Sequence, residues 1–230
     1  MRKISKTDTQ TSSKINAAKK ALDFVKDGMI IGLGSGSTAA YFIEFLGEKI
    51  KKEKLDIIGI PTSVESKNLG KKFGINIAQL NDVEKIDLAV DGADEIDENK
   101  FLIKGGGGYL TREKIIDYTA EKFIVIADDS KLVKHIGEEF PVPIEVIPFV
   151  WKFIKKKLEV SGDVVLRNKD KKTYVTDNGN YILDVHFDKI SDPVKLEDEL
   201  KRMQGVIESG IFTKKPDKII VGKPGSATIL

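Results

Sequence analysis

The stretch from Asp91 to Lys114 reads Asp-Gly-Ala-Asp-Glu-Ile-Asp, a short polar insert, and then Phe-Leu-Ile-Lys-Gly-Gly-Gly-Gly-Tyr-Leu-Thr-Arg-Glu-Lys. Two apolar runs end at charged groups here: Ile86–Val90 ends at the carboxylate of Asp91, and Phe101–Ile103 ends at Lys104. Apolar runs of this length, bounded by glycine and polar residues, are typical of buried strands in a parallel sheet. Because open parallel sheets bind ligands at the carboxyl ends of their strands, the stretch predicts a ligand site.

Four consecutive glycines, Gly105 to Gly108, follow Lys104. Glycine loses more backbone freedom on folding than any other residue, so a purely structural segment has little reason to keep four in a row. Such a run is expected where backbone N–H groups approach an anionic ligand closely. Asp94, which follows Asp91 closely in the chain, is expected at the same edge of the sheet.

The composition is that of a soluble globular protein with room for one large or two modest cores: 230 residues, 40% hydrophobic and 32% charged. The formal net charge of +2 argues against a nucleic-acid-binding surface. The lack of cysteine excludes disulfides and thiolate zinc sites and makes a reducing cytoplasm the expected compartment, while two histidines argue against a histidine-rich metal site. No stretch has the character of a signal peptide or a membrane span.

Strand and helix patterns alternate over residues 14–140, which predicts an α/β fold with a doubly wound parallel sheet and right-handed crossovers. Residues 1–13 are polar and predict a flexible N-terminal tail. The order βαββαβ over residues 141–213 predicts a ferredoxin-like α+β domain. The segment Asp217–Val221 predicts a last strand that returns to the first domain, so that residues 14–140 and 214–230 form one domain around an insertion.

A second ligand-binding element lies where the apolar run Met29–Leu33 continues into Gly34-Ser35-Gly36-Ser37-Thr38-Ala39 and then into an amphipathic helix. The helix start offers unpaired N–H groups and a positive dipole end, and Ser35, Ser37 and Thr38 add hydroxyls, so a phosphate is the expected occupant. A P-loop is excluded because the Gly-Lys-Ser/Thr ending is missing. The looser dinucleotide fingerprint fits, although no acid ends the next strand to hold a ribose, and a plain tight turn also stays open.

Further polar groups are expected at this edge of the sheet: Lys104, Glu113 in the first turn of the next helix, and Lys131 after a further strand. A carboxylate base and a cation that stabilises an oxyanion can enolise a small anionic substrate without a metal. Each residue also has a plainer interpretation. Glu113 can complement the helix dipole, Asp91 and Asp94 can bind loop N–H groups, and Lys131 can be a solvated surface lysine. The acidic cluster from Asp91 to Asp97 also suggests a magnesium site, which the neighbouring lysines disfavour.

Three segments together resemble the signature motifs of type A ribose-5-phosphate isomerase: Gly34 to Ala39, Asp91-Gly92-Ala93-Asp94-Glu95, and Lys104-Gly105-Gly106-Gly107 with Thr111-Arg112-Glu113-Lys114. The resemblance extends over nearly the whole chain from about Lys14, in the family's order and spacing. It implies a Rossmann-like doubly wound parallel sheet with an inserted ferredoxin-like α+β domain, assembled as a homodimer or homotetramer. It also implies interconversion of D-ribose 5-phosphate and D-ribulose 5-phosphate through an enediolate, in the non-oxidative pentose phosphate pathway, without metal or organic cofactor.

The resemblance assigns roles to individual residues. Glu113 matches the base that moves the proton, and Asp91 and Lys104 match catalytic groups at the reacting end of the sugar. The substrate-binding set that it implies is Ser35, Gly36, Ser37, Thr38, Asp91, Gly92, Ala93, Asp94, Lys104, Gly105, Gly106, Gly107 and Lys131. Departures from the family pattern are small: Ser35 stands where threonine is more usual, and Gly108-Tyr109 replace commoner small residues.

Two other functions stay open. Another sugar-phosphate or CoA-handling enzyme of the same superfamily would be expected to lack the combination of Lys104 and Glu113, which is present here. A non-catalytic sugar-phosphate sensor would be expected to carry a DNA-binding element, which the polar residues 1–13 cannot form. The expected partner is therefore a small sugar phosphate, with no nucleic acid, no membrane and no metal.

Overall fold

The structure is a computed structural model, and it describes residues 6–230. The chain divides into two compact units. The first unit comprises Met1–Gly92, Arg112–Lys131 and Pro216–Leu230, and the second comprises Ala93–Thr111 and Leu132–Lys215. Residues 93–111 and 132–140 thus belong to the second unit, whereas the sequence predicts them for the first domain.

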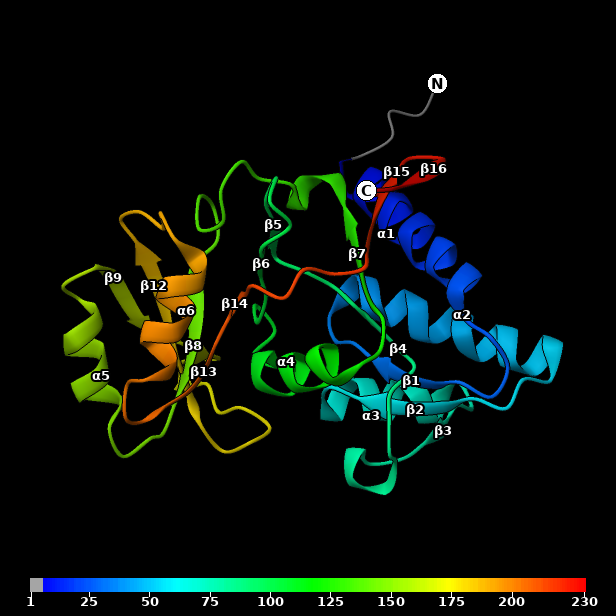
Figure 1. Cartoon of the computed structure of the whole chain (residues 1–230), viewed down its shortest axis with the longest axis horizontal. Helices are drawn as coiled ribbons and strands as arrows, with labels where there is room; N and C mark the ends of the chain where they lie inside the picture. The colour runs from blue at the N-terminus through cyan, green and yellow to red at the C-terminus, as the bar shows by residue number, and fades with distance from the viewer. Residues whose placement is uncertain (1–5) are drawn as a thin grey trace. The chain divides into compact units, whose positions relative to one another are not determined.

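The first unit is built on a seven-stranded sheet covered by helices (Figure 1). The strand order is β16-β15-β7-β4-β1-β2-β3, and all neighbours are parallel except β15 and β16. This is a doubly wound order whose direction reverses between β1 and β4. The elements are α1 (Lys6–Ala21), η1 (Leu22–Phe24), β1 (Ile30–Leu33), α2 (Ser37–Glu53), β2 (Ile58–Pro61), α3 (Val64–Lys72), β3 (Asn76–Ile77), η2 (Leu80–Asp82), β4 (Leu88–Asp91), β7 (Phe123–Asp128), η3 (Asp129–Lys131), β15 (Lys218–Lys223) and β16 (Ser226–Ile229); α4 (Leu110–Thr119) begins in the second unit and continues in the first.

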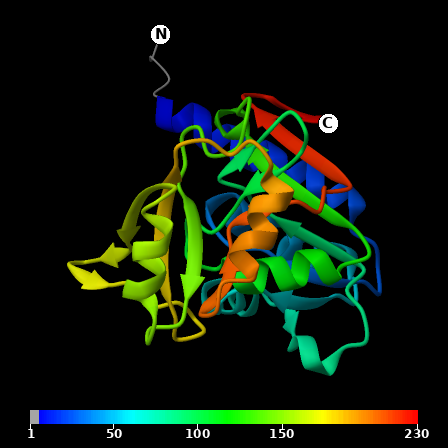
Figure 2. The same ribbon diagram turned by 60° about the vertical axis from the view of Figure 1, so that its left-hand side comes forward.

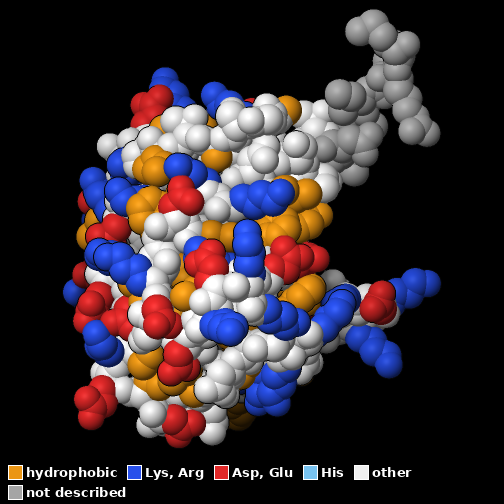
Figure 3. Space-filling model, turned by 90° about the vertical axis from the view of Figure 1, so that its right-hand side faces the viewer, with side chains coloured by type: hydrophobic (Ala, Val, Ile, Leu, Met, Phe, Trp, Pro, Cys, Tyr) orange, Lys and Arg blue, Asp and Glu red, His pale blue; other side chains and the backbone are white. Residues whose placement is uncertain are grey.

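Burial explains the apolar runs of the first unit. Strands β4 and β7 are buried over their whole length, as expected for parallel strands that are covered on both faces. Outside this core, Lys and Arg side chains are interspersed with Asp and Glu over the face drawn in Figure 3. No helix among residues 6–230 combines the length and the apolar character needed to cross a membrane.

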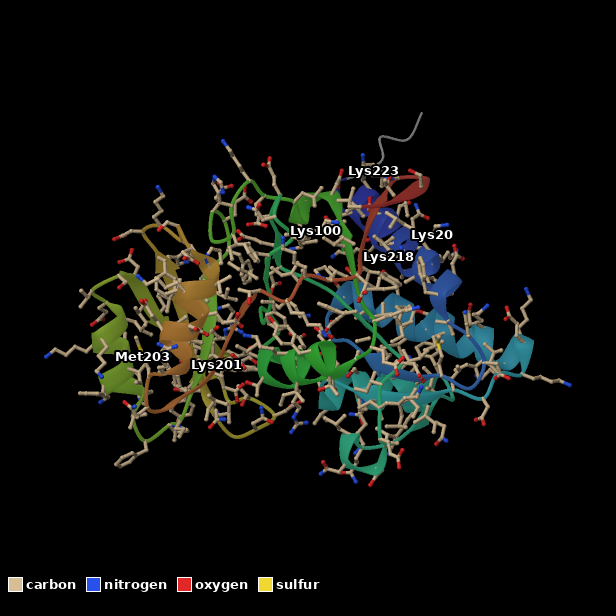
Figure 4. The ribbon with its side chains drawn as sticks, viewed as in Figure 1. Lys20, Lys100, Lys201, Met203, Lys218 and Lys223 are labelled. Atoms are coloured by element: carbon tan, nitrogen blue, oxygen red, sulfur yellow. The ribbon has the colours of Figure 1, made fainter. Side chains whose placement is uncertain are left out.

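Helix α1 begins at Lys6, so the predicted tail is wrong for residues 6–13, while residues 1–5 lie outside the described part of the chain. Packing is the reason, because Ala17, Ala18 and Ala21 are fully buried in the core of the first unit. The helix backbone also approaches β15 so closely that a Cβ on Gly222 would lie 1.8 Å from the carbonyl oxygen of Ser13. Figure 4 labels Lys20 in α1, and Lys218 and Lys223 at the two ends of β15.

Helix α3 begins one residue later than its sequence pattern suggests. Ser63 is the N-cap, and its side chain accepts a hydrogen bond from the N–H of Ser66 in a reciprocal capping box. The pattern Thr62-x-x-Glu65 predicts Thr62 in this role instead. The hydroxyl of Thr62 donates to the carbonyl oxygen of Leu33 at 3.1 Å, so this side chain binds the end of β1 and does not cap the helix.

The second unit contains a four-stranded antiparallel sheet in the order β13-β8-β12-β9 with two helices packed against it (Figure 2). Numbered along this βαββαβ unit, the order is the 4-1-3-2 arrangement of a ferredoxin-like domain. Lys201 of α6, labelled in Figure 4, pairs with Glu208 of β13 at 3.5 Å. The elements are β8 (Val142–Val146), α5 (Trp151–Leu158), β9 (Gly162–Leu166), the hairpin β10 (Asn168–Lys169) and β11 (Lys172–Thr173), β12 (Tyr181–Phe187), α6 (Pro193–Lys201) and β13 (Val206–Ser209).

A small three-stranded sheet completes the second unit and corrects one prediction. The run Phe101–Ile103 was expected in the parallel sheet, but β6 (Leu102–Ile103) pairs antiparallel with both β5 (Glu95–Ile96) and β14 (Ile211–Phe212). The expectation of a parallel strand here is therefore wrong. The partner strand β14 follows far along the chain, and pairing with it leaves β6 outside the seven-stranded sheet.

Candidate active site

The loop between β1 and α2 presents its backbone to solvent at Gly36 and Ser37, while Ser35 and Thr38 are buried. Gly36 is the N-cap of α2 and has a φ of +89°, which favours glycine. The hydroxyl of Ser35 lies 2.7 Å from the hydroxyls of both Thr62 and Ser63, so this side chain fastens the loop to the end of β2. Gly36 and Ser37 stand at the start of a 17-residue helix, a position whose N–H groups favour an anion.

Asp91 ends β4 and is fully buried beside this loop. Its Oδ1 accepts hydrogen bonds from the N–H groups of Ser35 at 3.0 Å and Gly92 at 2.7 Å. A Cβ on Gly34 would lie 2.1 Å from the same oxygen, so only glycine allows the loop to approach the carboxylate. The contact lies where the strand order reverses, which is the ligand-binding position of doubly wound sheets.

Strand β7, the neighbour of β4, brings a third set of polar groups to this edge of the sheet. Asp128 ends the strand, is buried, and accepts hydrogen bonds from the N–H and the hydroxyl of Ser130. Lys131 closes the short η3 turn that follows and is partly exposed. The first unit therefore collects the loop, Asp91 and Lys131 at the carboxyl ends of three adjacent strands.

Glu113 lies in the first turn of α4, as predicted, and is only 5% exposed. The same helix buries Lys114 and Asp117, which are 2% and 0% exposed. Sequence reasoning missed Asp117 because a single acid within a helix pattern carries no distinguishing signal. Ionisable side chains are seldom fully buried, so three of them on one helix make α4 a candidate element of the site.

In the second unit, Asp94 and Lys104 lie on neighbouring segments of the three-stranded sheet. The N–H of Asp94 donates to the carbonyl oxygen of Ile103 at 2.8 Å, and that of Lys104 donates to Gly210 at 3.0 Å. Lys104 is 2% exposed, and its ammonium lies 5.4 Å from the ring centre of Phe212. A buried lysine of this kind can supply a positive charge where an oxyanion forms.

The side chain of Asp94 binds the backbone of the glycine loop that follows Lys104. Oδ2 of Asp94 accepts a hydrogen bond from the N–H of Gly106 at 2.7 Å. Gly106 and Gly107 are exposed, whereas Gly105 and Gly108 are buried and have positive φ angles of 103° and 87°. The loop thus exposes peptide groups rather than side chains, as the four glycines predict.

The remaining acids of the cluster have structural roles. Glu95 is buried and accepts hydrogen bonds from the N–H groups of Glu139 and Phe140, both at 2.7 Å. Oδ1 of Asp97 accepts from the N–H groups of Asn99 and Phe101, both at 2.9 Å. Among residues 6–230, no group of three or more His, Cys, Asp or Glu side chains is arranged to hold a metal ion.

Sequence comparison identifies the family. The profile of ribose 5-phosphate isomerase A (phosphoriboisomerase A) matches residues 58–226. Ribose-5-phosphate isomerase A of Methanocaldococcus jannaschii is 50% identical over 221 residues, which cover 94% of this chain and 96% of that protein. The protein of the same name from Pyrococcus horikoshii is 52% identical over 211 residues, covering 90% of this chain and 92% of that protein.

Solved structures agree with the sequence match. Ribose 5-phosphate isomerase A from Methanocaldococcus jannaschii superposes with a TM-score of 0.92 at 47% identity, covering 96% of this chain and 99% of that chain. A D-ribose-5-phosphate isomerase in complex with phospho-erythronic acid superposes with a TM-score of 0.93 at 49% identity, covering 96% of this chain and 98% of that one. These likenesses confirm the predicted α/β fold class, and the chain belongs to the ribose-5-phosphate isomerase A family.

Proposed function

We propose that this chain interconverts D-ribose 5-phosphate and D-ribulose 5-phosphate through an enediolate, as a step of the non-oxidative pentose phosphate pathway. The observation that carries the proposal is its membership of the ribose-5-phosphate isomerase A family, at 50% identity over 94% of the chain to one relative. The chemistry of the residues is consistent with that reaction. They offer an anion loop, buried carboxylates and a buried ammonium group, which together suit proton transfer on a sugar phosphate.

The phosphate of the substrate is assigned to the loop from Ser35 to Thr38. Gly36 and Ser37 are exposed at the start of α2, where the helix dipole favours an anion. The hydroxyl of Ser37 accepts a hydrogen bond from the ammonium group of Lys14 at 3.0 Å, which places a positive charge beside the loop. Lys131 is assigned as a further substrate contact.

Glu113 is assigned as the base. It takes the proton from C2 of the aldose, and the electron pair left on C2 forms the enediolate while the negative charge develops on the C1 oxygen. The same carboxyl group returns the proton to C1, and one proton moves from the C2 oxygen to the C1 oxygen, so that the ketose forms with no atom gained or lost. One carboxylate on one face of the substrate is sufficient for both transfers.

Lys104 is assigned to the oxygen on which the negative charge develops, and Asp91 and Asp94 to the positioning of the reacting end of the sugar. A fixed ammonium group stabilises an oxyanion more strongly in a buried site than in water. One relative was solved in complex with phospho-erythronic acid, a sugar-acid phosphate whose carboxylate carries the paired oxygens that an enediolate also has. This ligand class fits the proposed reaction, which requires no metal or organic cofactor.

The test is the conversion of ribose 5-phosphate by the wild-type protein and by Glu113→Gln. Removal of a general base costs on the order of 10²–10⁴-fold, so kcat should fall by about that factor while substrate still binds. Glu121→Gln is the matched control, because the Glu121 side chain is 60% exposed and pairs only loosely with Lys85 at 3.6 Å. Normal turnover by Glu113→Gln would move the role of base to Asp91 or Asp94.

Two further measurements test other parts of the proposal. Isomerisation in D₂O should label the carbon that receives the proton, since a carboxylic proton exchanges with solvent, and the absence of any deuterium would favour a hydride shift. Activity should survive exhaustive chelation, and a loss that magnesium restores would contradict the metal-free route. We also propose a homodimer or homotetramer, which sedimentation velocity can test directly.

A further inference from the structure

Arg167, the residue after β9, holds the glycine loop from its carbonyl side. Its Nη1 donates to the carbonyl oxygens of Gly105 at 2.8 Å and Gly106 at 3.1 Å. Its Nε donates to Oδ2 of Asp184 on β12 at 2.8 Å, and its Nη2 pairs with the other carboxylate oxygen. One planar guanidinium thus connects a carboxylate on the four-stranded sheet to two consecutive peptide groups of the loop.

Tyr174 extends this contact to the next peptide group. Its hydroxyl donates to the carbonyl oxygen of Gly107 at 3.1 Å, and its ring centre lies 6.0 Å from the guanidinium carbon of Arg167. A Cβ on Gly108 would lie 2.3 Å from the same hydroxyl, so the ring and the loop are in close contact. The Arg167 and Asp184 side chains are only 13% and 18% exposed, which shields their ion pair from solvent.

Hydrogen bonds to these carbonyl groups also fix the direction of the N–H group that follows each carbonyl in the chain. In a trans peptide the carbonyl and the following N–H point in opposite directions. A Gly105 carbonyl held by Arg167 therefore turns the N–H of Gly106 away from Arg167, and that N–H donates to Oδ2 of Asp94 at 2.7 Å. A Gly106 carbonyl held in the same way turns the N–H of Gly107 to the opposite side.

We infer that Arg167, Tyr174 and Asp184 are positioning residues for the isomerisation. They fix three successive carbonyl groups of a loop that glycine would otherwise leave conformationally free, and so direct its N–H groups to Asp94 and to the substrate. The inference rests on the proposed function, because it takes Gly105, Gly106 and Gly107 as substrate-binding residues. None of the three side chains needs to touch the substrate.

The test uses the full-length protein with Arg167→Lys and Tyr174→Phe. Lysine keeps the charge but lacks the planar fork of donors that spans from Asp184 to the two carbonyl oxygens, and phenylalanine removes only the hydroxyl. Misplacement of a substrate-binding group by about 1 Å can cost about 10²-fold, so we expect kcat/KM to fall by about 10- to 100-fold in Arg167→Lys and less in Tyr174→Phe. Asp184→Asn should resemble Arg167→Lys.

Binding measurements separate positioning from a general loss of structure. Affinity for phospho-erythronic acid should fall by about tenfold in Arg167→Lys, the effect of one lost hydrogen bond, while inhibition by inorganic phosphate stays at the wild-type level. The matched controls are Arg202→Lys, whose side chain is 80% exposed, and Tyr181→Phe on β12; both should behave as wild type.

Two results would overturn the inference: wild-type kinetics in both Arg167→Lys and Tyr174→Phe, or a parallel loss of affinity for phosphate and phospho-erythronic acid. Failure of the proposed function would look different, because the wild type itself would then not isomerise ribose 5-phosphate. In that case the binding of phospho-erythronic acid still decides: weaker binding by Arg167→Lys supports the positioning role, and equal binding rejects it.

Discussion

The backbone N–H of Ser35 donates to Oδ1 of Asp91 at 3.0 Å, so the loop after β1 is fixed by the last residue of β4. A similar contact lies just before β4, where Oδ2 of Asp87 accepts from the N–H of Ile30 at 2.8 Å. Asp87 before β4 and Asp91 at its last position therefore bind the start of β1 and the loop after β1, respectively. Only the one at the carboxyl end lies where a doubly wound sheet binds its ligand.

This pair of aspartates gives a matched test of the site. Asp91→Asn loses the negative charge that two N–H groups share, so we expect kcat/KM to fall by about 10²-fold, by analogy with other losses of a positioned polar group. Asp87→Asn should lower the free energy of unfolding by about 1–3 kcal/mol, as for a hydrogen bond to a charged group, and leave kcat/KM unchanged. Equal activity losses in the two variants would contradict the assignment of Asp91.

Asp87 also predicts a pH dependence of stability. The N–H of Ile30 and then the ammonium group of Lys85 hold the pKa of Asp87 below its ordinary value of 3.8. A carboxyl group with a lowered pKa stabilises the folded state above its unfolded pKa, and this contribution is lost as the pH falls through the folded value. The stability difference between wild type and Asp87→Asn should therefore be constant from about pH 7 to pH 5 and shrink below about pH 4. Urea titrations across this range provide the measurement, and a difference that grows in acid would contradict it.

The phosphate assignment is tested at Gly36. Its φ is +89°, and a Cβ added there would have no atom within 4 Å, so Gly36→Ala strains the backbone without a clash. Gly225, between β15 and β16, is the matched control, with a φ of +79° and the same open space. Both variants should lose on the order of 1–3 kcal/mol of stability, as for residues held in sparsely populated backbone regions. Only Gly36→Ala should weaken competitive inhibition by inorganic phosphate, by about tenfold for one lost hydrogen bond. Inhibition that is unchanged in Gly36→Ala would place the phosphate elsewhere.

The parts of the fold that the sequence predicted correctly are those with local patterns. The doubly wound sheet was predicted from apolar runs, and the position of Glu113 from the glycine loop and the helix that follows it. Strand β6 was misassigned because a short apolar run does not show whether its partners are parallel or antiparallel. Its partners are the nearby β5 and the distant β14, and neither belongs to the seven-stranded sheet. The start of α1 was missed because polar residues precede the buried Ala17 and Ala18, and packing rather than propensity extends the helix.

In the candidate site, too, local motifs were predictable from the sequence, whereas side-chain contacts between distant segments were not. Motifs gave Asp91, Lys104 and Glu113, since each stands at the end of a strand or at the start of a helix. The hydrogen bonds of Arg167 were not predictable, because a single arginine in a strand pattern looks like any surface charge. The partner of the Ser35 hydroxyl was missed for a similar reason, because Thr62 and Ser63 belong to another strand–helix connection.

Lys104 is expected to act mainly in the transition state. A group that stabilises the enediolate affects kcat and kcat/KM together, whereas a phosphate contact affects mainly KM. Lys104→Ala should therefore lower kcat by about 10²–10³-fold, as found for lost oxyanion donors, with little change in KM. Lys215→Ala is the control, because the exposed Lys215 also lies near an aromatic ring, 5.6 Å from that of Phe101. A change confined to KM would reassign Lys104 to phosphate binding.

Glu145 on β8 is expected to be the main polar determinant of stability in the second unit. It is fully buried, and its Oε1 accepts hydrogen bonds from the Thr176 hydroxyl at 2.9 Å and from the amide of Asn180 at 2.8 Å. Its other oxygen accepts from the hydroxyl of Thr111, in the first turn of α4. Glu145→Gln turns an NH₂ group toward these donors, so at least one buried donor loses its acceptor, at a cost of about 3 kcal/mol. For a chain of this size that loss lowers the Tm by about 6–12 °C in a thermal melt.

Glu159→Gln is the control. It removes the same charge from a side chain that is 46% exposed, and it should change the Tm by about 2 °C or less. Equal Tm values for the two variants would show that the hydroxyl and amide donors around Glu145 find other acceptors, and that the buried carboxylate does not hold these segments together.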